Sequence, residues 1–285
     1  MIESPQYEEP IRILSDVHFG HPASMVEHPG QLVPLLRDAK TVVFNGDTVE
    51  LRYLRGRRIG LGNSRLMREV CESVGARPVF INGNHDPILS ELSHLDLVDG
   101  AVLVTHGDLL FHDISPWSHD AEALGEAHTR ELAVLGEDSL LDFEKRLKAS
   151  KRAALSIELH RSQPRRDKLS AIRTILRECW PPWRPLQILH SWAITPARAE
   201  AIARVFRPQA RFILIGHTHL SGCWRRGPRT IINTGSFLPL GGRMAIDVVG
   251  DTLTVRPILL ERGEFKAGEG MMRFAATRLL PDEAA

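Results

Sequence analysis

Residues that commonly bind metal ions recur in five short segments of the chain. In order, these are D-x-H at residues 16–18, G-D-x-x-E at 46–50, G-N-H-D at 83–86, H-G-D at 106–108 and G-H-x-H at 216–219. Their donors are carboxylates, imidazoles and an amide oxygen, a mixture that suits manganese, iron or zinc, and no cysteine occurs among them. The segments therefore predict a site for divalent cations without thiolate ligands.

Each segment directly follows a short apolar run that is typical of a buried strand. The runs cover residues 11–14, 41–44, 78–81, 101–104 and 211–215. In open α/β sheets, sites form beyond the carboxyl ends of the strands, so we expect the five segments to converge. At an extended strand end, residues two apart point the same way, which pairs Asp16 with His18 and His217 with His219. Glycines at positions 46, 83, 107 and 216 allow sharp turns and the close approach of a ligand.

The remaining pattern predicts one α/β domain over residues 1–285. Helical periodicity over residues 31–37 and 63–74 separates the first strands, as in βαβ units, and a meander of short strands follows residue 222. Residues 115–208 form an insertion between two core strands, with helices expected over residues 120–135, 139–160, 168–179 and 196–206. The insertion is either a cap over the site or a structural flank, and residues 263–285 are expected to be a peripheral tail.

The composition argues against several classes of protein. The 285-residue chain has 36 lysines and arginines against 35 acidic residues, and this net charge of +1 is unlike that of a bulk polycation for nucleic acid. No apolar run approaches the roughly 20 residues that a membrane span requires. The polar N-terminal residues are unlike a secretory signal, so we expect an intracellular, cytoplasmic protein.

Taken in order, the five segments resemble the signature of the calcineurin-like metallophosphoesterase superfamily, which is D-x-H, G-D-x-x-[DE], G-N-H-[DE], H and G-H-x-H. The match extends from Asp16 to His219, although the insertion carries none of it. The resemblance implies a four-layer αββα sandwich of two mixed sheets, with the helical insertion as a cap over the ligand-bearing edge. It also implies that the chain is a metal-dependent phosphohydrolase.

The resemblance further implies two divalent metal ions, manganese in the first place, with iron, zinc or cobalt as alternatives. One ion would be held by Asp16, His18 and His219 and the other by Asn84, His106 and His217, with the carboxylate of Asp47 bridging both. Two such ions about 4 Å apart lower the pKa of a bridging water and clamp the attacking and leaving oxygens of a phosphoryl group.

His85 occupies the position that the resemblance assigns to a residue outside the metal ligands. Such a histidine stabilises charge on the transferring phosphate and protonates the leaving oxygen. Glu50 matches the acidic position that holds this histidine in many members, so we predict a Glu50–His85 pair that raises the pKa of the imidazole. Asp86 either takes part in the site or only sets a turn, and Asp108 either takes part or orients the backbone around His106.

Two basic stretches bear on the substrate. Residues 51–68 contain six arginines and no acid, and residues 145–184 contain twelve basic residues against three acids. Because guanidinium groups bind phosphate oxygens, we predict a substrate with anionic groups besides the scissile phosphate. The candidate substrate-binding residues are Arg52, Arg55, Arg57 and Arg58. The longer stretch is either a binding surface or a solvated face.

Within the superfamily, the motifs are most similar to those of UDP-2,3-diacylglucosamine pyrophosphohydrolases, which typically carry G-N-R-D where this chain has G-N-H-D. The histidine is the version found in general phosphodiesterases and phosphomonoesterases. We therefore expect hydrolysis of a phosphodiester, pyrophosphate or phosphomonoester in a small or nucleotide-like compound, by attack of a metal-bridging water. The alternatives are the lipid-precursor pyrophosphohydrolase with peripheral membrane contact, a nucleic-acid phosphodiesterase, and a non-catalytic scaffold, which would lose ligands that are all present here.

Overall fold

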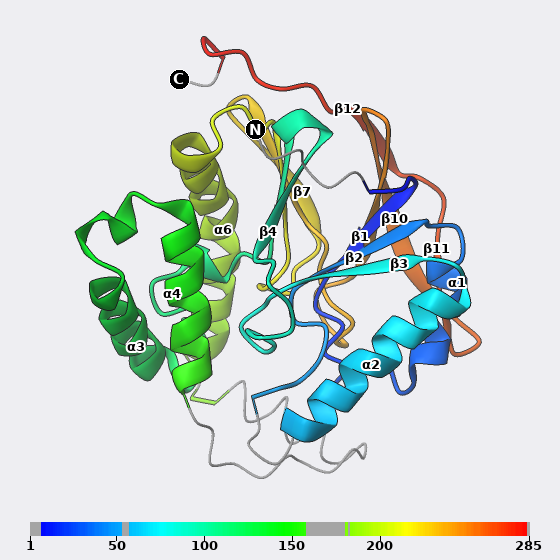
Figure 1. Ribbon diagram of the computed structural model, residues 1–285, viewed down its shortest axis with the longest axis horizontal. Coiled ribbons are helices and arrows are strands. Elements are labelled where there is room, and N and C mark those ends of the chain that lie inside the picture. The colour runs from blue at the N-terminus through cyan, green and yellow to red at the C-terminus, as the bar shows by residue number, and fades with distance from the viewer. Residues whose placement is uncertain (1–6, 53–56, 158–179, 182, 284–285) are drawn as a thin grey trace.

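The computed structural model describes residues 7–52, 57–157, 180–181 and 183–283. These residues form two mixed β-sheets that pack face to face, with helices on both outer faces (Figure 1). The four-layer αββα arrangement expected from the sequence is therefore present.

The first sheet is built on three parallel strands, β1 (Ile11–Leu14), β2 (Thr41–Asn45) and β3 (Arg77–Ile81). Antiparallel strands extend it beyond β1 in the order β9 (Met244–Val249), β10 (Thr252–Glu261) and β11 (Glu264–Ala267), and β12 (Met272–Ala275) also pairs with β10. Strands β11 and β12 fall in the stretch expected to be a peripheral tail. Phe265 of β11 is fully buried, so this part of the chain contributes to the core.

The second sheet also has a parallel centre, formed by β5 (Val102–Thr105), β6 (Phe212–Ile215) and β8 (Arg229–Asn233). Its two edges are the antiparallel strands β4 (His94–Leu97) and β7 (Gly222–Arg226). Both edge strands carry polar residues and are only partly buried, and neither stood out as an apolar run in the sequence.

The central strands are apolar on both faces because each face meets a different layer. Ile13 and Val43 point into the space between the sheets, where they join Val104 and Leu214 of the second sheet. The neighbouring Leu14 points to the opposite face, under the helices. This alternation explains the continuous apolar runs in the sequence, since no face of these strands is left to solvent.

Two helices cover the outer face of the first sheet. They are α1 (Val33–Leu36), which follows a 3-10 turn over Pro29–Leu32, and α2 (Arg57–Ser73). Leu36, Met67 and Cys71 are buried against this face. Helix α2 includes the region where a helix was expected, but it begins at Arg57 rather than at residue 63.

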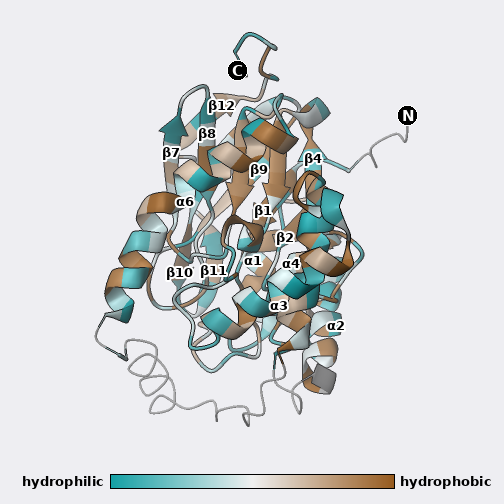
Figure 2. Ribbon diagram, turned by 90° about the vertical axis from the view of Figure 1, so that its left-hand side faces the viewer, coloured by the Kyte–Doolittle hydropathy of each residue, from teal (hydrophilic) through white to brown (hydrophobic). Residues whose placement is uncertain are grey.

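The insertion supplies the helical layer of the second sheet. Its described helices are α3 (Ala121–Val134), α4 (Phe143–Ser156) and α6 (Arg184–Phe206), and the helix expected over residues 168–179 lies outside the described residues. Leu147 of α4 and Ala199 of α6 pack against Ile213 of the sheet, while α3 packs against α4. In Figure 2 these helices carry both hydrophilic and hydrophobic bands, as one-sided burial requires. Helices α4 and α6 of the insertion thus flank the second sheet.

Candidate metal centre and active site

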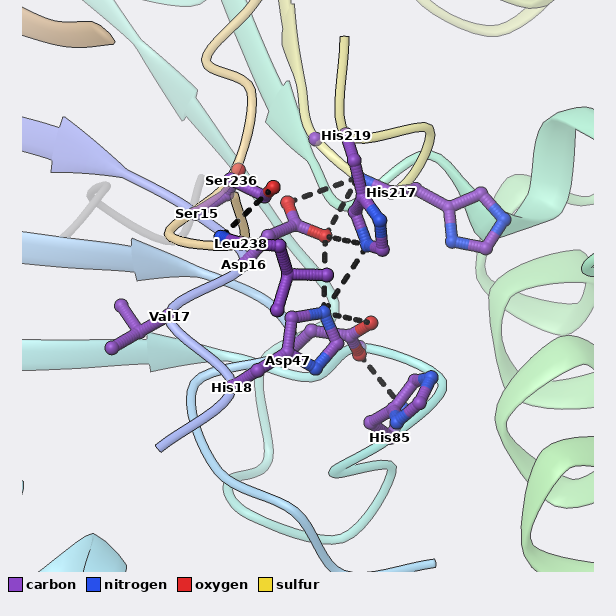
Figure 3. A network of polar contacts seen from close by, with 12 residues as sticks. Ser15, Asp16, Val17, His18, Asp47, His85, His217, His219, Ser236 and Leu238 are labelled. Carbon is purple, nitrogen blue, oxygen red and sulfur yellow. Dashed lines mark hydrogen bonds and ion pairs between the residues drawn. The ribbon is translucent and has the colours of Figure 1, made fainter. Parts of the chain in front are cut away.

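The five ligand segments lie together at the carboxyl ends of parallel strands of both sheets. Those after β1, β2 and β3 come from the first sheet, and those after β5 and β6 come from the second. Figure 3 shows Asp16, His18, Asp47 and His219 converging, with His85 beside Asp47. The structure therefore brings together the segments that the sequence led us to expect at one place.

The first ligand group consists of Asp16, His18 and His219. The Nε2 atoms of His219 and His18 lie 3.2 Å and 3.8 Å from Asp16 Oδ1. The same two Nε2 atoms are 3.2 Å apart. Asp16 and His18 are buried, whereas the side chain of His219 is 27% exposed. Burial lowers the pKa of His18 well below its usual value, so this imidazole is neutral near neutral pH.

The second ligand group consists of Asn84, His106 and His217, all of them buried. His106 Nε2 lies 3.1 Å from Asn84 Oδ1, while the opposite ring atom, Nδ1, donates to the carbonyl of Asn45 at 3.0 Å. His217 Nε2 donates to the carbonyl of Ile114 at 2.7 Å. The Ile114 carbonyl selects one tautomer of His217 and leaves its Nδ1 atom with a lone pair. Burial lowers the pKa of His217 to about 4, so its lone pair is available at neutral pH. His106 differs, because Asp47 outweighs burial and raises its pKa to about 9, so a metal ion would displace a proton from its Nε2 atom.

Asp47 belongs to both groups. Its Oδ2 atom lies 3.7 Å from His18 Nε2 and 3.3 Å from His106 Nε2. Burial alone would raise the pKa of Asp47, but His106 and His85 outweigh it and hold that pKa well below its usual value. The carboxylate is therefore ionised between the two sets of imidazoles.

The backbone at the ligands is left-handed rather than extended. Five of the ligand residues have φ between 49° and 67°, namely Asp16, His18, Asp47, His217 and His219. For non-glycine residues this conformation costs about 1–2 kcal/mol each, and such strain concentrates at functional sites. Asp16 and His18 do lie in one group as expected, although not through extended backbone. The expected pairing of His217 with His219 was wrong, because these two residues lie in different groups.

Glycines make room for the carboxylates of both groups. A Cβ atom at Gly83 would lie 2.1 Å from Asp47 Oδ1, and one at Gly216 would lie 2.1 Å from Asp16 Oδ2. A side chain at either position would displace the carboxylate. The close approach expected at these glycines is thus present in the structure.

Glu50 and His85 form the expected contact, with Glu50 Oε2 at 2.8 Å from His85 Nδ1. Glu50 is buried and its own pKa is lowered, because His85 outweighs the effect of burial. Burial alone would lower the pKa of His85, but the carboxylates of Glu50 and Asp47 raise it. The His85 amide also donates to Asp47 Oδ1 at 2.8 Å, which ties the pair to the shared ligand.

The candidate substrate-binding arginines fare differently. Arg52 lies at the site, with Nη1 at 3.2 Å from His85 Nε2. Arg57 and Arg58 are in the first turn of α2, and Arg55 lies outside the described residues. In the longer basic stretch, residues 158–179 lie outside the description, and Lys151 and Arg184 are buried rather than solvated.

Asp86 and Asp108 both support ligand segments. The Asp86 carboxylate accepts hydrogen bonds from the backbone amides of Asp47, Thr48, Val49 and Gly83, which fixes the loop after β2. Asp108 accepts from Lys151 Nζ at 2.6 Å and from the Ser150 hydroxyl, both on α4. Lys151 outweighs burial and lowers the pKa of Asp108 to about 2. Asp86 thus positions backbone that carries ligands, whereas Asp108 ties the segment after His106 to α4.

Three contributors were not anticipated from the sequence. The Ile114 carbonyl holds His217, and Trp192 Nε1 donates to the carbonyl of Thr218, between two ligand histidines, at 2.7 Å. The ring of His21 lies 5.9 Å from that of His18, and burial lowers the pKa of His21 to about 4. The spacing of His21 from His18 was a usable signal, whereas the other two contacts depend on tertiary packing.

The donors fit a pair of divalent ions. Ligand atoms of Asp16, His18, Asp47 and His219 all lie within 4.8 Å of one another, and so do those of Asp47, His106 and His217. The facing Nε2 atoms of His18 and His219 cannot both present lone pairs to each other without a proton or a cation between them. The mixture of carboxylate, imidazole and amide oxygen suits borderline divalent metals.

No model of a protein family matches the sequence, and no curated protein is significantly similar to it. Similar solved structures include the phosphoesterase Yfce from E. coli, at 14% identity over 94% of this chain and 99% of that chain, with a TM-score of 0.39. A dimetal phosphatase from Danio rerio has 12% identity over 94% and 99%, with a TM-score of 0.40. Vps29 from Entamoeba histolytica, complexed with zinc, has 14% identity over 93% and 97%, with a TM-score of 0.38.

In the order of its ligand segments and in its two packed sheets, the chain resembles calcineurin-like metallophosphoesterases. Every helix within the described ranges is too short or too polar to pass through a bilayer.

Proposed function

We propose that this chain is a metal-dependent phosphoesterase centred on the two ligand groups that share Asp47. The observation that carries the proposal is the position of Asp47 Oδ2, within 3.7 Å of an imidazole nitrogen of each group. A carboxylate shared in this way suits two divalent ions held side by side, and His85 lies next to it.

The first ligand group would hold one ion and the second ligand group the other, with manganese as the first candidate and iron, zinc or cobalt as alternatives. When bound, the two ions supply Lewis-acid charge and lower the pKa of a coordinated water. The protein contributes preformed donors, since the Asn45 and Ile114 carbonyls orient two of the imidazoles in advance.

His85 would act as the general acid. Glu50 holds its Nδ1 atom, so the opposite Nε2 atom is the one that delivers a proton to the leaving oxygen. Glu50 and Asp47 raise the pKa of His85, which makes the ring a better proton carrier than an isolated imidazole. Glu50 would orient the ring and stabilise its charge.

The substrate would be a phosphodiester, a pyrophosphate or a phosphomonoester. Cleavage of a UDP-sugar lipid would identify the lipid-precursor pyrophosphohydrolase, and cleavage of single-stranded DNA would identify the nucleic-acid phosphodiesterase. A purified protein with less than about one metal ion per chain would instead favour a non-catalytic scaffold.

The direct test is hydrolysis of bis(p-nitrophenyl) phosphate by metal-stripped protein after addition of Mn, Fe, Zn or Co. We expect at least one metal to restore turnover. Asp47→Ala removes a ligand of both ions, so it should lower kcat/KM about 1000-fold and reduce the metal content below one ion per chain. Inactivity with all four metals, or unchanged turnover of Asp47→Ala, would contradict the proposal.

The role of His85 is tested with two leaving groups. His85→Ala should lower kcat about 100-fold for an alkyl phosphodiester, whose leaving oxygen needs a proton, but only several-fold for the p-nitrophenyl ester, which leaves as a stable anion. Equal losses on both esters would remove His85 from the role of acid.

A further inference from the structure

Arg52 is anchored next to His85 by a carboxylate that both residues use. Glu50 Oε1 accepts a hydrogen bond from the Arg52 backbone amide at 3.0 Å, while Glu50 Oε2 holds His85 Nδ1. The same carboxylate thus holds both the Arg52 main chain and the His85 ring. This places the start of the arginine side chain at the edge of the site.

The Arg52 guanidinium reaches the reactive side of His85. Its Nη1 atom lies 3.2 Å from His85 Nε2, the atom opposite the Glu50 contact. Since a guanidinium only donates, His85 Nε2 accepts from Arg52 in this arrangement. A substrate oxygen that separates the two groups would lie within reach of both. A guanidinium is always charged and carries five N–H donors, so it suits a phosphoryl oxygen at this position.

Asp120 holds the other branch of the guanidinium. Arg52 Nη2 lies 3.2 Å from Asp120 Oδ2, and the two side chains are only 18% and 23% exposed. Asp120 belongs to the insertion and directly precedes α3, yet its side chain makes no capping hydrogen bond to that helix. The carboxylate is thus directed at Arg52 rather than used to start the helix.

An ion pair within α3 provides an exposed pair for comparison with the Arg52–Asp120 pair. Arg130 and Glu126 of α3 are 3.6 Å apart with side chains 66% and 65% exposed. Such exposed pairs contribute little, whereas the Arg52–Asp120 pair is largely shielded and links segments 68 residues apart. The contrast indicates a positional role for Asp120.

We propose that Arg52 binds a phosphoryl oxygen of the substrate beside His85, and that Asp120 is a positioning residue that holds the guanidinium there. The inference rests on the proposed phosphoesterase function. It gives the insertion a part in substrate binding through a single carboxylate, in addition to its packing on the second sheet.

Kinetics of single and double variants test the proposal. Arg52→Met should raise KM for a phosphodiester about 30-fold with a smaller change in kcat, since a charge-assisted hydrogen bond is lost. Asp120→Asn should raise KM about 5-fold, because the guanidinium remains but is no longer held. The double variant should be no worse than Arg52→Met alone, because Asp120 acts only through Arg52. Arg52→Lys should recover part of the loss.

A binding measurement separates this inference from the proposed activity. Calorimetric titration of the metal-loaded protein with inorganic phosphate should show the same order of weakening, with Arg52→Met weaker than Asp120→Asn and both weaker than wild type. Phosphate binding that depends on both residues, in a protein that hydrolyses no ester, would sustain the inference and contradict the phosphoesterase proposal. If hydrolysis and phosphate binding are both unchanged in Arg52→Met, the inference about Arg52 is contradicted and the phosphoesterase proposal stands.

The matched controls are Arg130→Met and Glu126→Gln, which remove the same charges from the exposed pair on α3. Both should leave KM and phosphate affinity within twofold of wild type. Additive losses in the Arg52→Met/Asp120→Asn double variant would overturn the positioning role, as would a lower KM in Asp120→Asn. A melting temperature within a few degrees of wild type for each variant excludes unfolding as the cause.

Discussion

The two ligand groups differ in how their imidazoles are held before any ion arrives. In the second ligand group, His106 and His217 each donate to a backbone carbonyl and are buried. In the first ligand group, the Nδ1 atom of His18 has no hydrogen-bond partner within the described part of the chain, and His219 is partly exposed. The imidazoles of the second ligand group are therefore held by the protein more firmly than those of the first.

This difference predicts unequal affinities. A donor whose orientation is already fixed loses less conformational freedom when it binds, so the second ligand group should take up an ion first. Because the side chain of His219 is 27% exposed, the first ligand group should exchange its ion more readily.

The largest effects should come from exchanging one histidine of each group for alanine. Manganese titration of the wild-type protein should show two binding steps in calorimetry. His217→Ala should abolish the tighter step and His219→Ala the weaker one, and each should lower kcat/KM about 100-fold or more because both ions are needed. Survival of the tighter step in His217→Ala would reverse the order of the two sites.

A smaller effect is expected from Lys151→Met, which acts behind the second ligand group. Without the ammonium group, the buried Asp108 carboxylate loses its partner, which should lower the free energy of unfolding by about 3 kcal/mol in chemical denaturation. The tighter metal step should weaken about 10-fold, with the weaker step unchanged.

Two further variants calibrate this result. Arg152→Met removes the neighbouring, more exposed cation and should change the free energy of unfolding by less than about 1 kcal/mol. Adding Asp108→Asn to Lys151→Met removes the unpaired charge and should recover part of the stability. A Lys151→Met protein as stable as wild type would show that the pair does not support the site.

The smallest effect should come from Trp192→Phe. This change removes the indole N–H that holds the Thr218 carbonyl, between the histidines of the two groups. Loss of one hydrogen bond of about 1 kcal/mol corresponds to about 5-fold in affinity, and it should appear in the weaker step because His219 is the less restrained neighbour. Trp224→Phe, in the packing of α6, is the control and should leave both steps unchanged.

Much of the site could be predicted from the sequence because its ligands directly follow apolar strands. The runs before Asp16, Asp47, Asn84, His106 and His217 all form strands, and parallel strands bring their carboxyl ends to one edge. Hydrophobic periodicity and turn-forming residues could not predict the left-handed backbone at the ligands. That conformation is imposed by the convergence of several loops rather than by local sequence.

The helices of the insertion were less predictable, because tertiary packing there outweighs local signals such as proline. The helix expected to begin at Pro196 begins at Arg184 and continues through that proline. A proline inside a helix costs about 3 kcal/mol, but Thr195, Pro196 and Ala199 are buried on the inner side of α6, and this burial offsets the cost. Asp120 gave no signal, since its partner Arg52 is distant in sequence.

The ligands are drawn from the strand ends of both sheets, and this has a consequence for the cohesion of the molecule. Ions bound by these residues would act as a cross-link between the two halves of the sandwich, fastening them at one edge. Because a species that binds only the folded chain stabilises it by mass action, resistance to heat would rise and fall with the free metal concentration. The cations that take part in catalysis would thus also stabilise the fold.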